Sequence, residues 1–131
     1  HQLESFLAAK NILVCLLPLT EETEDILNLS LFKKLGKPAF LINAARGSHL
    51  VEEDLIYALD MGLLDYVTLD VFQKEPLPES HPFWSRDNIT ITPHVASVTQ
   101  PEEVAEIILE NYKRMRSNLD LLYRVDRYKG Y

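Results

Sequence analysis

Short apolar stretches alternate with amphipathic stretches along the chain, a pattern typical of strands and helices that take turns. Four apolar stretches predict strands, at residues 11–17, 39–42, 66–69 and 88–91. The first stretch is apolar at both odd and even positions and stops at Pro18. This pattern is typical of a strand buried on both faces of a parallel sheet. We therefore expect a parallel sheet with helices over both of its faces.

The segments before and after the first strand carry helix signals. A short helix is expected to end near Leu7. After the strand, Thr20 supplies a hydroxyl cap, and Glu21 and Glu22 place acid in a first helical turn. The sequence therefore predicts a helix that starts at Thr20 and continues to Gly36.

Two further helices are predicted downstream. Residues 52–60 keep apolar positions on one helix face, and Gly62 follows as a C-terminal cap. Thr99 and Glu102 have the spacing of a capping box, and the apolar stripe after them predicts a helix to about residue 117 or 118. Helices that alternate with strands over short links place the chain in the α/β class.

Composition excludes several classes of protein. The 131 residues are enough for one ordinary domain. The longest apolar run has six residues, far below the roughly 20 that span a bilayer. The net charge of −7 argues against nucleic acid as a partner. Because no signal peptide is visible and Cys15 is the single cysteine, we expect a cytoplasmic protein without disulfides.

Candidate chemistry gathers where the predicted strands end. In an open parallel sheet, ligands bind beyond the carboxyl ends of the strands. Arg46, Asp70 and His94 each follow a predicted strand. Glu75 lies near the start of a long proline-containing loop at 73–88, and loops of this length in a compact α/β unit are usually functional. We therefore expect these side chains to lie along one edge of the sheet.

Each candidate has a chemical interpretation and a structural one. Arg46 can hold a planar carboxylate through two parallel hydrogen bonds, or it can be a surface residue in a turn. His94 can donate a proton near neutral pH with Glu75 orienting it, or both can be solvated loop residues. Asp70 can accept a hydrogen bond from a cofactor amide, or it can cap a turn. Position alone leaves these alternatives open.

Other polar and aromatic residues point less clearly to chemistry. His49 and His81 do not follow a strand directly, and we expect both to be structural. Trp84 is expected to anchor the long loop. The four histidines are not spaced as metal ligands, so we expect no metal site.

One motif of dinucleotide-binding sheets is missing from the sequence. Such a site needs a Gly-x-Gly-x-x-Gly turn whose backbone amides meet the pyrophosphate. The four glycines, at 36, 47, 62 and 130, form no such turn. Either the sheet serves another purpose, or its first half lies outside this sequence. A half-domain of another class, such as a methyltransferase, would not need Arg46 and His94 after successive strands.

Four ordered blocks cover nearly the whole chain. They are Leu-Leu-Pro-Leu-Thr-Glu-Glu-Thr at 16–23, Leu-Ile-Asn-Ala-Ala-Arg-Gly at 41–47, Leu-Asp-Val-Phe-Gln-Lys-Glu-Pro-Leu-Pro at 69–78 and Thr-Pro-His-Val-Ala-Ser at 92–97. These blocks resemble the D-isomer-specific 2-hydroxyacid dehydrogenases. The ending at 125–131, with His-Pro-Phe-Trp at 81–84, is most similar to the glyoxylate/hydroxypyruvate reductase A branch. The resemblance implies the second half of a Rossmann-type doubly wound parallel sheet, and hydride transfer between NAD(P)H and a 2-oxo acid.

The resemblance also implies a role for each candidate residue. Arg46 would bind the carboxylate and carbonyl of the substrate, and His94 would be the general acid. Glu75 would pair with His94, and Asp70 would face the nicotinamide amide. The residues that would contact the cofactor are Leu17, Pro18, Thr23, Ala44, Ala45, Arg46, Asp70, His94, Ala96 and Ser97.

The resemblance covers only part of the family's length. It implies that 1–118 form the C-terminal half of an NAD(P)-binding domain and that 119–131 are a tail that returns to a substrate domain. The expected cofactor is NADP, with NAD as the alternative. The expected partners are a small 2-oxo acid and, at full length, a second copy in a homodimer. Because the phosphate turn lies outside this stretch, we expect the stretch alone to be inactive.

A second function fits the same resemblance. Some relatives of this fold are NAD(H)-binding corepressors, and such a module can keep Arg46, Glu75 and His94. Oxidation of NADPH in the presence of glyoxylate distinguishes a reductase from a corepressor.

Overall fold

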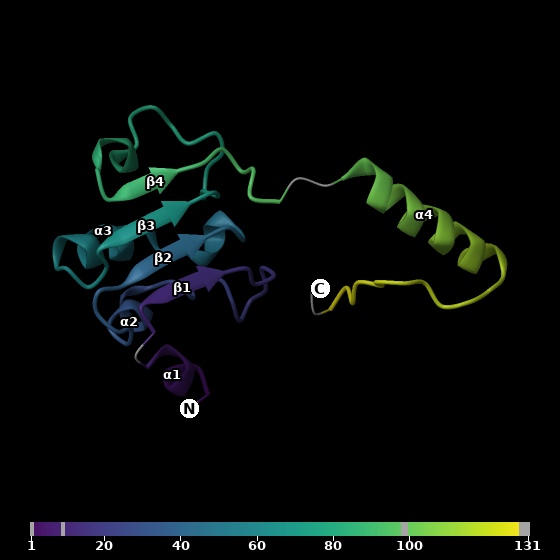
Figure 1. Cartoon of the computed structure of the whole chain (residues 1–131), viewed down its shortest axis with the longest axis horizontal. Helices are drawn as coiled ribbons and strands as arrows, with labels where there is room; N and C mark the ends of the chain where they lie inside the picture. Colours follow the sequence, from purple (N-terminus) through teal and green to yellow (C-terminus); the bar gives the residue numbers. More distant parts are fainter. Residues whose placement is uncertain (1, 9, 98–99, 129–131) are drawn as a thin grey trace. The chain divides into compact units, whose positions relative to one another are not determined.

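The computed structural model describes residues 2–8, 10–97 and 100–128. It forms two compact units, one within residues 1–96 and one within 97–131. The first unit contains α1 (Gln2–Leu7), β1 (Ile12–Cys15), α2 (Leu29–Phe32), β2 (Phe40–Asn43), α3 (Glu52–Asp60), β3 (Tyr66–Leu69) and β4 (Ile89–Ile91), with short 3-10 helices at Gly47–His49 and Pro82–Ser85 (Figure 1). The second unit contains α4 (Pro101–Arg116).

The four strands form one parallel sheet in the order β1-β2-β3-β4, which confirms the predicted α/β class. Cys15 pairs with Asn43, Asn43 with Leu69, and Leu69 with Ile91, so the last residues of the strands are in register. The loops that leave the carboxyl ends of all four strands therefore start from the same edge of the sheet.

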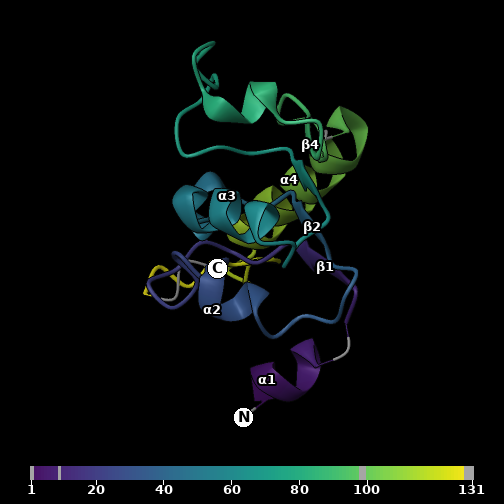
Figure 2. The same ribbon diagram turned by 90° about the vertical axis from the view of Figure 1, so that its left-hand side faces the viewer.

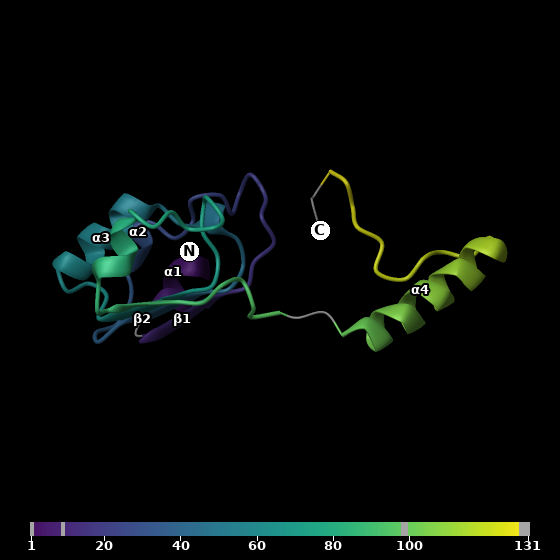
Figure 3. The same ribbon diagram turned by 90° about the horizontal axis from the view of Figure 1, so that it is seen from above.

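The core lies on one face of the sheet. Leu13, Leu41 and Val67 point into it from neighbouring strands and are buried. α2 and α3 lie on this face, which Figure 3 shows with the sheet seen from its edge, and α3 contributes Leu55 and Ala58. Burial of apolar side chains between these helices and the sheet supplies the main driving force for folding of this unit.

The predicted burial of the first strand on both faces is wrong for the described part of the chain. In β1, Leu13 is 8% exposed, whereas Ile12 is 64% and Val14 is 48% exposed. Phe40 and Tyr66 continue the exposed face on β2 and β3. The reason is that α2 and α3 lie together on one face of the sheet, so alternate strand residues of the first unit point away from both helices.

The predicted helix from Thr20 to Gly36 is also wrong at both ends, since α2 covers only Leu29–Phe32 and turns follow it. The Thr23 hydroxyl accepts a hydrogen bond from the Thr20 amide at 2.8 Å, and residues 21–25 form turns instead. Asp25 has a φ of 53°, which no helix interior tolerates. α2 begins only at Leu29, where the Asn28 side chain caps the amide of Leu31 at 3.1 Å. Asn28, rather than Thr20, is therefore the residue that starts this helix.

The remaining predicted elements are confirmed, with small shifts. α1 ends at Leu7, and α3 and β3 have the predicted bounds. Gly62 has a φ of 61° and follows the last turn of α3, as expected of a C-terminal glycine. No helix in the described ranges is long and apolar enough to cross a membrane. Figure 2 shows α1 beyond the β1 edge of the sheet.

In the second unit, α4 ends at Arg116, close to the predicted end. Its N-cap is Gln100, without a side-chain cap, and the predicted capping residue Thr99 lies outside the described residues. The chain after α4 turns back onto the helix, because the Asn111 side chain bonds both backbone polar atoms of Leu122, at 2.7 and 3.2 Å. Residues 129–131 of the predicted tail also lie outside the described residues.

A close backbone contact joins the loops that follow β2 and β3. A Cβ atom on Gly47 would lie 2.0 Å from the carbonyl carbon of Phe72 and 2.4 Å from the amide nitrogen of Gln73. Any residue other than glycine would therefore force the two loops apart.

We expect Gly47→Ala to lower the free energy of unfolding by about 3 kcal/mol, the upper end of the range for overpacking, because the new methyl group meets backbone that cannot rotate away. Gly62→Ala is the matched control: its Cβ meets nothing within 4 Å, and only the positive φ opposes it. That strain costs roughly 1 kcal/mol. Urea unfolding of the two variants measures the difference, and equal losses would contradict the close contact.

Candidate active site

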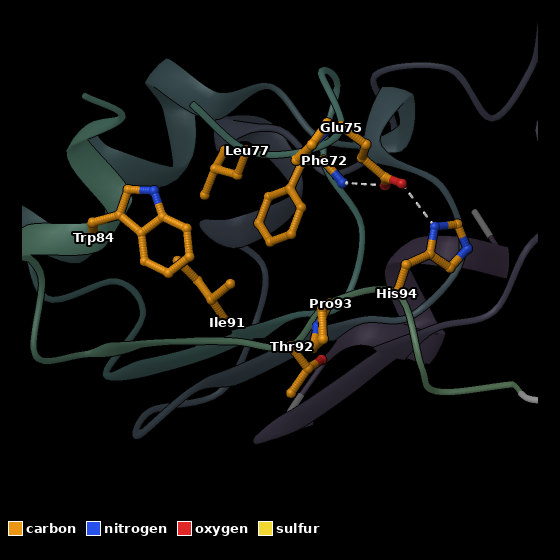
Figure 4. A pocket seen from close by; sticks show the side chains of 9 residues that line it. Phe72, Glu75, Leu77, Trp84, Ile91, Thr92, Pro93 and His94 are labelled. Carbon is orange, nitrogen blue, oxygen red and sulfur yellow. Dashed lines mark hydrogen bonds and ion pairs between the residues drawn. The ribbon is translucent and has the colours of Figure 1, made fainter. Parts of the chain in front are cut away.

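An ion pair stands at the carboxyl edge of the sheet. His94 follows β4 and Glu75 follows β3, and the Nδ1 of His94 lies 2.8 Å from the Oε2 of Glu75 (Figure 4). The other carboxylate oxygen of Glu75 accepts a hydrogen bond from the Phe72 amide at 2.9 Å. The carboxylate is thus held at one end by backbone and orients the imidazole with the other, which leaves Nε2 as the ring nitrogen available for chemistry.

The surroundings favour the ionised form of Glu75. The hydrogen bond from His94, followed by that from the Phe72 amide, holds the pKa of Glu75 below its ordinary value of 4.5. The pair therefore has the arrangement expected of a general acid and the carboxylate that supports it.

Asp70, at the end of β3, fastens the segment that carries His94. Its side chain is buried, with 3% exposure. Oδ1 accepts hydrogen bonds from the Thr92 hydroxyl and from the Val95 amide, the latter at 3.0 Å, and Oδ2 accepts one from the Ala96 amide at 2.9 Å. Asp70 therefore holds the chain on both sides of His94.

The backbone of His94 is held in an unusual conformation. Its φ is 54°, in the left-handed region that residues other than glycine seldom occupy. The bonds of Asp70 to Thr92 on one side and to Val95 and Ala96 on the other impose this conformation. Strain of this kind persists where surrounding structure over-determines the backbone, and it directs the His94 side chain toward Glu75.

A pocket of about 330 Å³ adjoins the ion pair. Glu75 and His94 lie at one end of it, and Trp84 lies at the other (Figure 4). The Trp84 indole donates a hydrogen bond to the Pro78 carbonyl at 2.9 Å, so it anchors the long loop as expected, although its ring is half exposed. The side chains between the two ends are mostly apolar: Phe72, Pro76, Leu77, Ile91 and Pro93.

Arg46 lies in the loop after β2, on backbone that buried side chains hold in place. The Asn43 amide donates to the Arg46 carbonyl at 3.1 Å, and the Arg46 amide lies 3.2 Å from the Nδ1 of His49. The guanidinium donates to the Ala45 carbonyl at 2.6 Å. Gly47, the next residue, packs on Phe72, so the Arg46 loop directly adjoins the segment that holds Glu75.

The loop after β1 contains the first predicted cofactor contacts. The Thr23 hydroxyl donates to the Pro18 carbonyl at 2.7 Å and closes this loop. Leu17, just before it, is exposed. Directly after the neighbouring strand β2, the Ala44 amide donates a hydrogen bond to the Cys15 carbonyl at 3.3 Å. These positions lie at the same edge of the sheet as Asp70, as the strand-end argument predicts.

Other sequence predictions have mixed outcomes. His81 is structural, as expected: it contacts Glu52 at 3.2 Å and accepts a hydrogen bond from the Phe83 amide. Ser97 falls in the second unit. His49 is also structural, as expected: it is buried, and its ring contacts the backbone of Arg46 and Pro18. The role of Asn43 was missed, because an amide at the end of a strand has no obvious reaction to perform. Within the described ranges, no group of three or more potential ligands is placed to hold a metal ion.

The chain matches the model of a protein family over residues 1–96, that of the D-isomer specific 2-hydroxyacid dehydrogenase, NAD binding domain. The chain belongs to this family. The match confirms the resemblance seen in the four sequence blocks, and it identifies the parallel sheet as part of a Rossmann-type domain. The Asp70, Glu75 and His94 interactions described above all lie within the matched residues of the 2-hydroxyacid dehydrogenase domain.

Two curated relatives carry the same name. The chain is 52% identical over 114 residues to glyoxylate/hydroxypyruvate reductase A of Photorhabdus laumondii, which covers 87% of this chain and 36% of that protein. It is 45% identical over 131 residues to glyoxylate/hydroxypyruvate reductase A of Yersinia enterocolitica, which covers 100% of this chain and 42% of that protein. The chain therefore spans about two fifths of the length of these relatives.

Solved structures support the same assignment. A D-isomer specific 2-hydroxyacid dehydrogenase from Xanthobacter autotrophicus, in complex with NADPH and MES, superposes with a TM-score of 0.93 at 43% identity, over 98% of this chain and 53% of that one. The NADPH-dependent glyoxylate/hydroxypyruvate reductase of Sinorhizobium meliloti, in complex with NADP and sulfate, gives 0.93 at 39% identity, over 98% and 42%.

Asp70 makes acid stability testable. Burial raises its pKa, but the hydrogen bonds from Thr92, Ala96 and Val95 outweigh burial and bring the pKa below the ordinary value of 3.8. Because the pKa is lower in the folded state, ionised Asp70 stabilises the fold at pH values above its pKa in the unfolded chain. This contribution is lost as the pH falls through the pKa of Asp70 in the folded protein. We expect Asp70→Asn to cost roughly 1 to 3 kcal/mol at neutral pH, because the amide loses the negative charge and replaces one accepting oxygen by an NH2 group.

The measurement is the thermal unfolding midpoint of wild type and Asp70→Asn as a function of pH. The difference in unfolding midpoint between wild type and variant is expected to stay constant near neutral pH and to shrink below about pH 5. A gap that persists unchanged into strong acid would contradict the assigned hydrogen bonds.

Proposed function

We propose that this chain is part of an NAD(P)H-dependent 2-oxoacid reductase that converts glyoxylate and hydroxypyruvate to glycolate and glycerate. The observation that carries the proposal is the Glu75–His94 ion pair at the carboxyl edge of the sheet, beside the loop of Arg46. The names and bound nucleotides of the relatives support the substrate class and favour NADP as the cofactor. On this proposal, residues 1–118 belong to the cofactor domain and 119–131 return to a substrate domain.

The residues present fit a nicotinamide amide. A carboxylate can accept about four hydrogen bonds. Among the described residues, Asp70 accepts three, two on Oδ1 and one on Oδ2. The remaining acceptor position, on Oδ2, suits an N–H donor such as a carboxamide. Leu17, Pro18, Thr23, Ala44, Ala45, Ala96 and Ser97 would complete this chain's contacts.

His94 is the proton donor of the proposed reaction. When bound, a reduced nicotinamide supplies a hydride to the carbonyl carbon of the substrate. As charge develops on the carbonyl oxygen, the Nε2 of His94 donates a proton to it, and Glu75 stabilises the imidazolium before the transfer. The fixed Nδ1–Glu75 bond aims Nε2, so the ring does not have to reorient during the reaction.

Arg46 is the substrate-binding residue of the proposed reaction. Its guanidinium pairs with the carboxylate of the 2-oxo acid and stabilises negative charge on the carbonyl oxygen. The loop that carries it is fixed by Asn43 and by the close contact of Gly47 with Phe72. The carboxylate and the carbonyl of the substrate are thereby held in one plane for attack.

His94→Gln in the full-length protein tests the general acid. We expect kcat with NADPH and glyoxylate to fall by about 100-fold or more, because an amide cannot deliver the proton. The matched control is His81→Gln, which changes a histidine of the same unit outside the proposed site and should leave kcat unchanged. Steady-state oxidation of NADPH measures both, and near-normal turnover of His94→Gln would reject His94 as the acid.

Glu75→Gln tests the ion pair. The Nδ1 of His94 loses its charged acceptor, so the ring is aimed less firmly and we expect kcat/KM to fall. The measurement is kcat/KM for glyoxylate in wild type and variant at neutral pH. An unchanged value would show that Glu75 does not support the proton donor.

A further inference from the structure

His49 is a buried imidazole that the proposed mechanism does not use. It is 0% exposed and ends the 3-10 helix that follows Arg46. Its Nδ1 lies 3.2 Å from the Arg46 amide nitrogen, and its Nε2 lies 3.3 Å from the Pro18 carbonyl oxygen. One rigid ring thus connects the loop after β1 with the loop after β2.

The partners of the two ring nitrogens determine where the proton lies. Nδ1 lies near both polar backbone atoms of Arg46. The amide nitrogen, at 3.2 Å, can only donate, and the carbonyl oxygen, at 3.1 Å, can only accept. The Pro18 carbonyl can only accept, so the hydrogen is on Nε2. We assign the Nε2–H tautomer because it satisfies the Arg46 amide and the Pro18 carbonyl together. A proton on Nδ1 would satisfy only the Arg46 carbonyl, which already accepts from the Asn43 side chain. A ring bonded at both ends keeps a fixed separation between the two loops.

The two loops have different tasks under the proposed function. Arg46 binds the 2-oxo acid, and its carbonyl is also held by the Asn43 side chain at 3.1 Å. The loop at 17–23 contacts the cofactor, and its Pro18 carbonyl also accepts from the Thr23 hydroxyl at 2.7 Å. A 1 Å misplacement of reacting groups can cost about 100-fold in rate. The separation of these loops therefore matters for hydride transfer.

We propose that His49 is a positioning residue that sets the distance between the substrate-binding Arg46 and the cofactor-binding loop at 17–23. This inference rests on the proposed function. It acts through backbone at both ends, since Nδ1 holds the Arg46 amide and Nε2 holds the Pro18 carbonyl. Loss of one end releases one loop and leaves the other held.

Two near-isosteric variants separate the two ends of the ring. His49→Asn keeps an acceptor near the position of Nδ1 and removes the donor to Pro18. His49→Gln keeps a donor near the position of Nε2 and removes the acceptor for the Arg46 amide. In the full-length protein we expect His49→Asn to raise KM for NADPH roughly tenfold with KM for glyoxylate unchanged, the fold-change that loss of one buried hydrogen bond produces. We expect His49→Gln to raise KM for glyoxylate roughly tenfold, for the same reason, and to leave KM for NADPH unchanged.

A purely structural role would move both constants together. Parallel changes of both KM values in the two variants, or no change in either, would overturn the inference. His81→Gln is the control for loss of a histidine elsewhere in the unit and should change neither KM. If the wild-type protein fails to oxidise NADPH with any 2-oxo acid, the proposed function itself is overturned. The two failures are therefore distinguishable.

Nitrogen-15 NMR of the histidine rings in the full-length protein tests the geometry without an activity assay. We expect the Nδ1 signal of His49 to show an unprotonated nitrogen and Nε2 a protonated one. A proton on Nδ1 would overturn the assigned network and the positioning role with it.

Discussion

The backbone of Gly47 lies against the backbone of Phe72, and the geometry of the candidate site depends on that contact. Arg46 precedes Gly47, and the Phe72 amide holds Glu75, which in turn holds His94. The contact therefore joins a guanidinium from one strand end to an ion pair built on two others. Register of the parallel strands brings these loops to one edge, and the absence of a side chain at Gly47 lets them touch.

The two carboxylates near His94, those of Asp70 and Glu75, differ in burial and in what they hold in place. Asp70 is buried, and its oxygens are occupied by groups on both sides of His94, so it shapes the backbone. Glu75 is exposed and contacts the ring itself. Both carboxyl groups have a lowered pKa, so both are ionised at neutral pH. A strained backbone and an aimed side chain are thus maintained by separate groups.

Much of the fold follows from local pattern. The apolar stretch at 66–69 and the amphipathic stretch at 52–60 have the observed bounds of β3 and α3, since nearby residues decide both. The start of α2 could not be predicted from local pattern alone. One of its first amides, that of Leu29, is capped by Asp54, which lies 25 positions further along the chain. Exposure of Ile12 and Val14 was likewise unpredictable, because it depends on which layers cover the sheet.

The candidate site shows the same division. Strand ends identify Arg46, Asp70 and His94, since topology alone brings such ends together. The 2.8 Å contact of Glu75 with His94 was expected from the family resemblance. His49 was expected to be structural, and it is buried. Its partners could not be predicted, because they are two backbone atoms from different loops, which only the folded arrangement brings to one ring.

A crystal structure of the full-length protein with NADPH and oxamate, an unreactive analogue of a 2-oxo acid, tests the central claim most directly. The account predicts that the Nε2 of His94 lies within about 3 Å of the amide oxygen of oxamate, at hydrogen-bond distance, while Glu75 still holds Nδ1. The Arg46 guanidinium is expected on the oxamate carboxylate. Oxamate bound away from both side chains, or a His94 ring turned from the ligand, would contradict the account.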